Sequence, residues 1–251
     1  MHLVKPVLSI LGAAIVALSL PISGTCEGQT LPPPSQTPPG QITITLPAHE
    51  ATIGPDDSQF AYKEIQHLEQ EGKYDEALAK ANAAVEADPK KITPYVLRGH
   101  IYSEMNQLDK ADADFLTILQ IDPNNFPAQF NRCEIKLSKK DYDGARDGFT
   151  SLEKNPDWGD LAAYKVFVCD LFAGHELASR SELETFNRLE TRASYFYANA
   201  TWSFYHKQPQ EGQSFIDSAQ RIYPRKTVYF YSSTLVDLGY IKPLQEDVKV
   251  P

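Results

Sequence analysis

The chain has 251 residues, of which 24 are lysine or arginine and 33 are aspartate or glutamate, giving a formal net charge of −9. This length and a hydrophobic content of 42% suffice for one large domain or two small ones with a real core. The negative charge argues against a general nucleic-acid binder, because there is no surplus of basic residues to neutralise phosphates. Three cysteines are too few for a fold built on disulfides.

The first 25 residues have the parts of a secretory signal peptide. Lys5 gives a basic start, residues 7–20 form an apolar run, and Pro21 precedes the small residues at 23–25. The apolar run is shorter than the roughly 20 residues that a membrane-spanning helix needs. We therefore expect an exported protein with no membrane span after cleavage, placed in the periplasm, associated with the cell envelope, or secreted. The alternative is an uncleaved membrane anchor.

Cys26 follows the apolar run, where a bacterial lipoprotein carries its lipidated cysteine. Ser23, Gly24 and Thr25 stand in the box before it, and two of these three positions fit the lipoprotein pattern badly. Lipidation of Cys26 therefore stays an alternative to simple cleavage near residue 25.

Residues 26–57 predict a proline-rich, flexible segment. Five prolines fall within residues 31–40, a density that favours extended polyproline II structure and excludes a packed helix. A tether is the simpler interpretation, and a ligand for an aromatic groove is the alternative. Residues 42–46 alternate like a short strand, but we assign no role to residues 41–46.

A period of 34 residues governs the rest of the chain. Three alanines and two prolines recur at that spacing, and each unit has the pattern of two amphipathic helices ended by a proline. Small residues stand where paired helices must approach closely. The structural repeat positions are Ala77, Pro89, Gly99, Ala111, Pro123, Ala145, Ala178, Gly212 and Pro224. One such hairpin cannot bury its apolar faces, but stacked copies can.

These residues resemble the tetratricopeptide repeat, with a small residue at place 8, an aromatic at 17, alanine at 20 and proline at 32. The repeats run over 58–91, 92–125, 126–158, a degenerate 159–192, and 193–226, and residues 227–251 form a capping helix, over 227–239, and a tail. Ile65 in the first repeat and Glu182 and Glu190 in the fourth depart from the pattern. The resemblance implies an all-α fold: a right-handed α-α superhelix of about five helical hairpins plus a C-terminal helix.

The resemblance also implies a concave groove, which the first helices of this family line through places 2, 5, 9 and 12. Carried onto this chain, these places give Tyr62, Gln66, Val96, His100, Phe130, Glu134, Phe167, Asp170, Tyr197, Thr201 and Phe204. Fifteen of the 27 aromatic residues lie between Tyr164 and Tyr231. They either pack between degenerate repeats or form an aromatic end of the groove that anchors a peptide.

No pattern of residues indicates a reaction. The histidines and cysteines lack zinc-site spacing, and neither a nucleophile elbow nor a glycine-rich phosphate loop is present. We therefore expect no catalytic residue, metal or cofactor. Cys133 and Cys169 fall at inward-facing places of neighbouring repeats, where free buried thiols are the simpler expectation and a disulfide the alternative.

The sequence thus predicts an exported, non-enzymatic adaptor that binds a partner protein or peptide in the concave groove of a solenoid. One alternative is an envelope assembly factor anchored by a lipid on Cys26. The other is an enzyme with a site in the aromatic C-terminal region.

Overall fold

A computed structural model describes residues 57–242. Within that range the chain forms eleven α-helices and no strand, which confirms the predicted all-α superhelix of helical hairpins. The predicted signal peptide, Cys26, the proline-rich segment up to residue 56, and the tail from residue 243 lie outside the described residues.

Ten of the helices described within 57–242 pair into five hairpins, and an eleventh follows them. The pairs are α1 (Asp57–Gln70) with α2 (Tyr74–Ala87), α3 (Ile92–Glu104) with α4 (Leu108–Ile121), α5 (Phe126–Ser138) with α6 (Tyr142–Leu152), α7 (Gly159–Ala173) with α8 (Glu176–Asn187), and α9 (Ala193–Tyr205) with α10 (Pro209–Ile222). The last helix is α11 (Arg225–Asp237), which begins two residues before the predicted start at 227.

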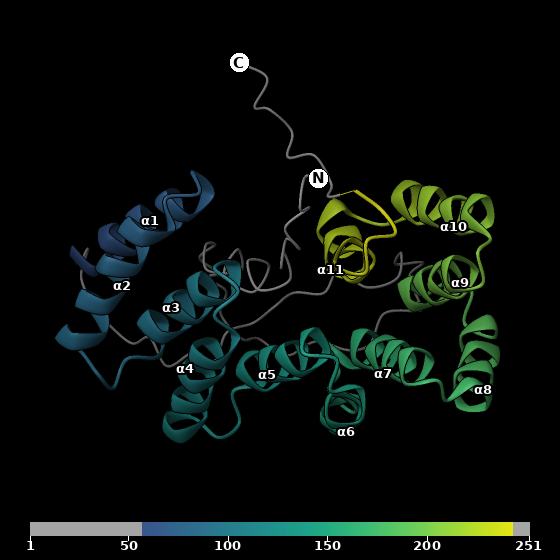
Figure 1. The fold of residues 1–251 in the computed structure, drawn as a ribbon, viewed down its shortest axis with the longest axis horizontal. Coiled ribbons are helices and arrows are strands. Elements are labelled where there is room, and N and C mark those ends of the chain that lie inside the picture. Colours follow the sequence, from purple (N-terminus) through teal and green to yellow (C-terminus); the bar gives the residue numbers. More distant parts are fainter. Residues whose placement is uncertain (1–56, 243–251) are drawn as a thin grey trace, which may run out of the picture.

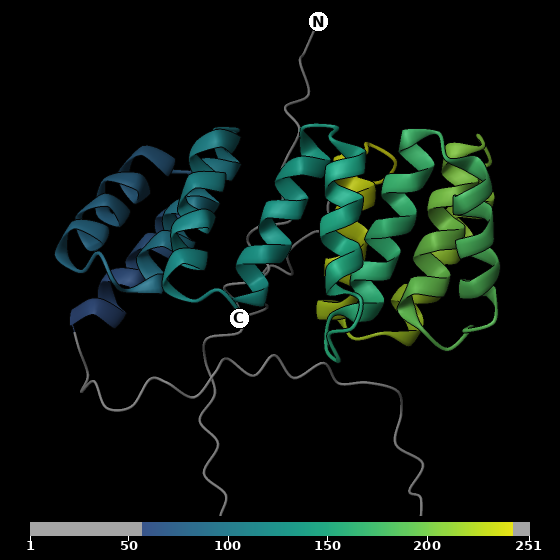
Figure 2. The same ribbon diagram turned by 90° about the horizontal axis from the view of Figure 1, so that it is seen from below.

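The hairpins follow one another along an arc (Figure 1). Helices α3, α5, α7 and α9 lie toward the inner side of this arc, and α4, α6 and α8 lie on its outer side. We call the side formed by α3, α5, α7 and α9 the inner face. Helix α11 lies on the inner face next to α9, and Figure 2 shows it behind the hairpins of the second half of the stack.

The turn inside each hairpin repeats one backbone feature. One residue just after the first helix has a positive φ in every hairpin: Gly72 (72°), Asn106 (57°), Lys140 (61°), Gly174 (84°) and Lys207 (62°). A left-handed residue at this place ends a helix by redirecting the chain. The 34-residue period is therefore present in the backbone as well as in the side chains.

Polar side chains cap the hairpin in the middle of the stack. The side-chain oxygen of Asn125 accepts a hydrogen bond from the backbone N–H of Ala128 (3.1 Å), and Asp141 accepts one from that of Gly144 (3.1 Å). Each cap satisfies one of the amides that the first turn of a helix leaves unpaired. The sequence thereby sets where α5 and α6 begin.

Small residues allow the paired helices to approach closely. Ala77, Ala111 and Ala145 are completely buried. A β-carbon added to Gly99 would lie 3.0 Å from Cζ of Phe115, and one added to Gly212 would lie 2.9 Å from the ring of Phe204. These helices could not hold their present separation with larger side chains at the two glycines.

Helix α7 is the most buried element of the stack. Eleven of its 15 residues are buried, on every side of the helix, because α6, α8 and α9 all contact it. A helix that is apolar all round has no amphipathic period. This explains why the fourth repeat is degenerate in sequence while its helices are regular in structure.

Candidate functional site

The structure places the predicted groove residues in two groups. Tyr62 and Gln66 on α1 and Val96 on α3 are partly exposed. The other eight are buried, with at most 8% of their surface accessible: His100, Phe130, Glu134, Phe167, Asp170, Tyr197, Thr201 and Phe204. In the structure these eight side chains lie in the core and do not line an open groove.

The end of the inner face formed by α7 and α9 is filled by α11. The ring of Tyr231 lies 5.2 Å from that of Tyr197 and 5.5 Å from that of Tyr164, between centroids. The hydroxyl of Tyr197 donates a hydrogen bond to the carbonyl of Val228 (3.3 Å). The chain's own C-terminal helix therefore occupies the aromatic surface that the sequence suggested for a peptide.

The segment after α11 covers the next part of the same surface. The ring of Phe204 stacks on that of Tyr240 at 5.3 Å with an interplanar angle of 11°. Phe204 also lies against Gly212 of α10. The C-terminal aromatic residues named here therefore pack inside the stack, and they do not form an open aromatic end of the groove.

The buried polar side chains at the predicted groove places are held inside the stack. Lys165 Nζ lies 2.7 Å from Glu134 Oε1, with side-chain exposures of 0% and 1%, and the two side chains form a buried ion pair. Burial raises the pKa of Glu134, and the charge of Lys165 opposes that rise. Thr201 Oγ1 lies 2.9 Å from the hydroxyl of Tyr164 and donates to the carbonyl of Tyr197 (2.7 Å).

His100 is completely buried against Phe115, and neither ring nitrogen has a hydrogen-bond partner in the described part of the chain. Burial lowers its pKa to about 3, so the imidazole is neutral at neutral pH. Buried in this way, His100 is a core residue.

Asp170 is fixed by a network at the turn between α7 and α8. Its carboxylate accepts hydrogen bonds from Arg146 Nε (2.9 Å) and lies 2.9 Å from Nδ1 of His175. Burial acts to raise the pKa of Asp170, but these contacts outweigh burial and hold the pKa below its usual value. The residue joins α6 to α7 and α8.

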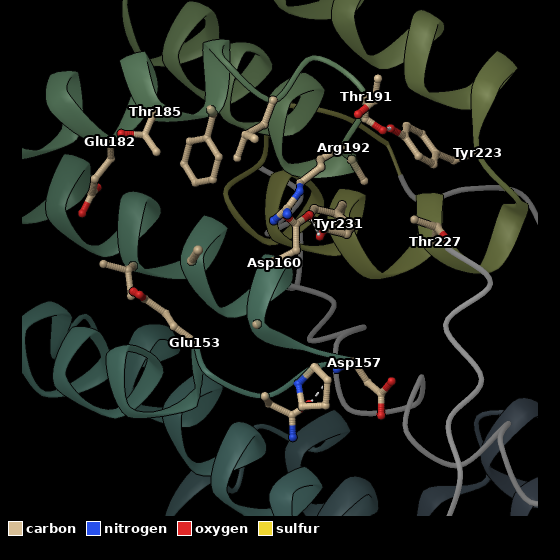
Figure 3. A pocket seen from close by; sticks show the side chains of 18 residues that line it. Glu153, Asp157, Asp160, Glu182, Thr185, Thr191, Arg192, Tyr223, Thr227 and Tyr231 are labelled. Carbon is tan, nitrogen blue, oxygen red and sulfur yellow. Dashed lines mark hydrogen bonds and ion pairs between the residues drawn. The ribbon is translucent and has the colours of Figure 1, made fainter. Parts of the chain in front are cut away.

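A separate pocket of about 620 Å³ opens near the start of α7 (Figure 3). Its walls come from the α6–α7 connection, α7, α8, the α8–α9 connection and α11. Asp160 lies at its centre and accepts hydrogen bonds from the hydroxyls of Tyr231 (2.6 Å) and Ser194 (2.8 Å). Arg192 Nη1 lies 3.3 Å from the same carboxylate. We call this the Asp160 pocket.

Reasoning from the sequence did not find the Asp160 pocket. Its residues come from segments far apart in the chain, from Glu153 to Tyr231. One signal was present: Asp160 stands at place 2 of the fourth repeat, a place that faces the groove in the family.

The described residues offer little for redox or metal chemistry. Cys133 and Cys169 are both free and buried, as the simpler expectation had it. Burial raises the pKa of Cys133 to about 11, so its thiol is protonated and unreactive at neutral pH. In the part of the chain that the structure describes, no group of three or more His, Cys, Asp or Glu residues is arranged to hold a metal. None of the described helices has the length and apolarity to cross a bilayer.

Comparisons with known proteins agree with this architecture. Residues 92–125, which span α3 and α4, match the family model of the tetratricopeptide repeat. A tetratricopeptide repeat protein from Parabacteroides merdae has a similar fold, with a TM-score of 0.57 and 18% identity over 74% of this chain and 73% of that one. No curated protein sequence matches significantly.

Two further solved structures have the same fold. PilW, a type IV pilus biogenesis factor, has a TM-score of 0.53 and 15% identity over 74% of this chain and 91% of its own. MamA from Desulfovibrio magneticus has a TM-score of 0.51 and 14% identity over 68% of this chain and 97% of its own. The chain therefore contains a tetratricopeptide repeat at α3–α4, and the stacked hairpins of residues 57–242 have the fold of solved tetratricopeptide repeat proteins.

Proposed function

We propose that the chain is an exported, non-enzymatic adaptor that binds a partner protein or peptide through α1 and α3, at the N-terminal end of the stack. Stacked helical hairpins present extended concave surfaces that bind other chains. The signal-peptide pattern of residues 1–25 supports export to the periplasm, the cell envelope or the medium.

The choice of α1 and α3 as the binding surface rests on one observation. Helix α11 covers the inner face of the last two hairpins, whereas none of the described helices crosses α1 and α3 (Figure 1). Tyr62, Gln66 and Val96 lie there and are partly exposed. An aromatic ring, an amide and a branched aliphatic side chain can together anchor a peptide and orient its backbone.

The boundary between the covered and uncovered halves is aromatic. The ring of Trp158 lies 5.4 Å from that of Phe230 on α11 and 5.6 Å from that of Phe126 on α5. Because these rings join α11 to α5, a peptide on α1 and α3 would end at this cluster.

The test is an affinity capture from envelope extract on the mature chain beside its Tyr62→Ala/Val96→Ala variant. We expect a protein that the wild type retains and the variant loses. The control is Leu116→Ala on α4, which removes an exposed apolar side chain (41% accessible) elsewhere. Equal retention by wild type and the double variant, with equal helix content by circular dichroism, would remove this surface as the binding site.

Mass spectrometry of the mature protein tests export and distinguishes the lipid-anchored alternative. Cleavage near residue 25 with an unmodified terminus supports a soluble exported adaptor. A mass increase equal to a diacylglyceryl group on Cys26 would instead support the alternative, an envelope factor anchored by a lipid.

A further inference from the structure

The fourth hairpin is out of step with the repeat because its first helix is longer. Helix α7 has 15 residues, whereas α3, α5 and α9 have 13 each. Counted from the positive-φ residue of each turn, Leu183 takes the buried place of Phe115 and Phe149. Glu182 falls one position earlier, at the place that Asp114 holds in the second hairpin.

These two equivalent carboxyl groups have opposite partners. Asp114, on α4, accepts hydrogen bonds of 2.6 and 2.9 Å from the guanidinium of Arg98 on α3. Glu182, on α8, is instead hydrogen-bonded to a second carboxyl group, that of Asp170 on α7. Two carboxylates at this separation repel each other, so the contact between α7 and α8 requires a proton.

The neighbours of the two groups decide which of them carries the proton. The side chain of Asp170 is 1% exposed, and its carboxylate lies 2.9 Å from Arg146 Nε and 2.9 Å from His175 Nδ1. Within residues 57–242, Glu182 forms no ion pair with a cation. Asp170 therefore stays ionised, and the protonated carboxyl group of Glu182 donates to it.

The charged and titratable groups around Glu182 favour this protonated form. They are Arg146 and Glu153 on α6 and at its end, Asp170 and His175 at the turn between α7 and α8, and Asp157, Asp160 and Arg192 around the Asp160 pocket. Arg146 favours ionisation of Glu182, but its guanidinium is already bound to Asp170, and Glu153 opposes ionisation. Burial, and then the charge of Asp170, raise the pKa of Glu182 to about 8.

Helix α8 is attached to the stack by few side chains. Three of its 12 residues are buried, Ser179, Leu183 and Phe186, compared with eleven of 15 in α7. Figure 3 shows Glu182 on the wall that α8 contributes to the Asp160 pocket. A helix with so few buried contacts can open locally, so a change of one charge at its contact with α7 can shift that opening.

We propose that the proton between Glu182 and Asp170 is a latch that holds α8 on α7, and that alkaline conditions release it. When Glu182 ionises, its proton passes to water, and two carboxylates then face each other where one donated a hydrogen bond to the other. Helix α8 separates from α7, and the Asp160 pocket opens on that side. This device does not depend on the partner surface of α1 and α3.

The sign of the effect follows from the raised pKa of Glu182. The latch is intact well below about pH 8 and is lost as the pH rises through that value. When α8 is open, the carboxyl group is in water and its pKa returns to near 4.5. The equilibrium constant for opening should therefore rise roughly tenfold between pH 7 and pH 9.

Hydrogen exchange of the full mature chain, followed by mass spectrometry with millisecond mixing, measures this opening. Exchange is recorded at pH 7 and pH 9 and corrected for the intrinsic rate of each amide. We expect the roughly tenfold rise in α8. Helix α10 is the internal reference, because its acidic side chains, Glu211 and Asp217, are exposed, and its opening should not change.

Two variants with the same change in charge separate the latch from general electrostatics. Glu182→Gln keeps a hydrogen-bond donor of similar shape but cannot ionise, so α8 should open equally at both pH values. Glu184→Gln, at an exposed position of the same helix, should keep the full rise. Because Glu182→Gln leaves His175 in place, a rise that persists in this variant would belong to the imidazole and would overturn the proposal.

A carboxyl titration by carbon-13 NMR supplies a second measurement, which needs no variant other than the one that identifies the signal. The resonance that is absent from Glu182→Gln should titrate in the wild type with a midpoint near pH 8. A midpoint near pH 4.5, or wild-type opening of α8 that is equal at pH 7 and pH 9, would also overturn the proposal.

Discussion

The hydroxyl of Tyr231 on α11 donates a 2.6 Å hydrogen bond to Oδ2 of Asp160, 71 positions earlier at the start of α7. The same carboxylate accepts from Ser194 Oγ at the start of α9. One side chain thus joins two hairpins to the helix that covers them. Burial and the charge of Asp160 hold the pKa of Tyr231 well above its usual value, so the phenol remains a donor.

Replacing Tyr231 by phenylalanine should destabilise the C-terminal half of the stack. The ring keeps its packing on Tyr164 and Tyr197, but a buried bond to a charged acceptor is lost, which costs about 1.5–3 kcal/mol. Urea unfolding followed by circular dichroism measures this. Tyr205→Phe, at a side chain 39% exposed, is the control and should leave the free energy of unfolding unchanged. Equal stability of Tyr231→Phe and wild type would mean that this bond does not hold α11.

The buried ion pair between Lys165 and Glu134 should behave differently when one or both partners are removed. Lys165→Met leaves a buried carboxylate without its cation, and we expect a loss of about 3–5 kcal/mol. Glu134→Leu/Lys165→Met removes both charges and should unfold at a urea concentration close to that of wild type, or higher. A double variant as unstable as the single one would show that the pair supports the stack by more than charge balance.

An exposed ion pair of the same stack provides the comparison. Lys139 Nζ lies 2.5 Å from Asp109 Oδ1, whose side chain is 95% exposed. Water screens such a pair, so Lys139→Met should change the free energy of unfolding by less than about 1 kcal/mol.

The hairpins could be predicted from the sequence because each one is a local pattern. The pattern depends on residues whose roles are local, such as Ala111, Phe115 and Pro123. The predicted repeat 92–125 accordingly contains α3 and α4 in the structure. The sequence did not indicate that Tyr197 and Phe204, two residues of the predicted groove, are covered in the structure. The residues that cover them, Tyr231 and Tyr240, lie more than 30 positions away, beyond the last predicted repeat.

The Asp160 pocket was out of reach for a related reason. Glu153, Glu182 and Arg192 stand in three different connections or helices, and only the stacking of α7 between its neighbours brings them together. A repeat pattern predicts one hairpin and its position in the stack. It does not predict which side chains from other segments pack around an irregular connection between hairpins.

Lys140 holds a backbone conformation that glycine adopts at equivalent turns. Its φ is 61°, whereas Gly72 and Gly174 occupy the same place in the first and fourth hairpins. A residue with a side chain in this left-handed conformation is strained by about 1–2 kcal/mol. Glycine removes this strain, but its larger conformational entropy in the unfolded chain cancels part of the gain. Lys140→Gly should therefore raise the free energy of unfolding by about 0.5–1 kcal/mol. Gly174→Ala is the reciprocal test and should lower it; stabilisation by both changes would contradict this account.

Two carboxyl groups, at the C-terminal ends of α1 and α3, make stability depend on pH. Burial, and then the charge of Glu104, raise the pKa of Glu69 to about 7, and burial raises that of Glu104 to about 7. The two groups also raise the pKa of Tyr74, after burial, so the three side chains lie near one another. The folded chain thus binds protons here that the unfolded chain, with pKa values near 4.5, has already released.

The sign of the pH dependence follows from these raised values. The contribution of Glu69 and Glu104 is fully present below about pH 4.5 and is lost as the pH rises through about 7. Between pH 5 and pH 8 the free energy of unfolding should fall by about 1–3 kcal/mol, taking roughly 1.4 kcal/mol per pKa unit and discounting for solvent. Glu69→Gln/Glu104→Gln should flatten this fall in urea unfolding measured at each pH, because glutamine keeps the shape of the protonated acid. Glu86→Gln, on the exposed face of α2, should leave the profile as it is. A double variant that keeps the full pH dependence would place the responsible groups elsewhere in the chain.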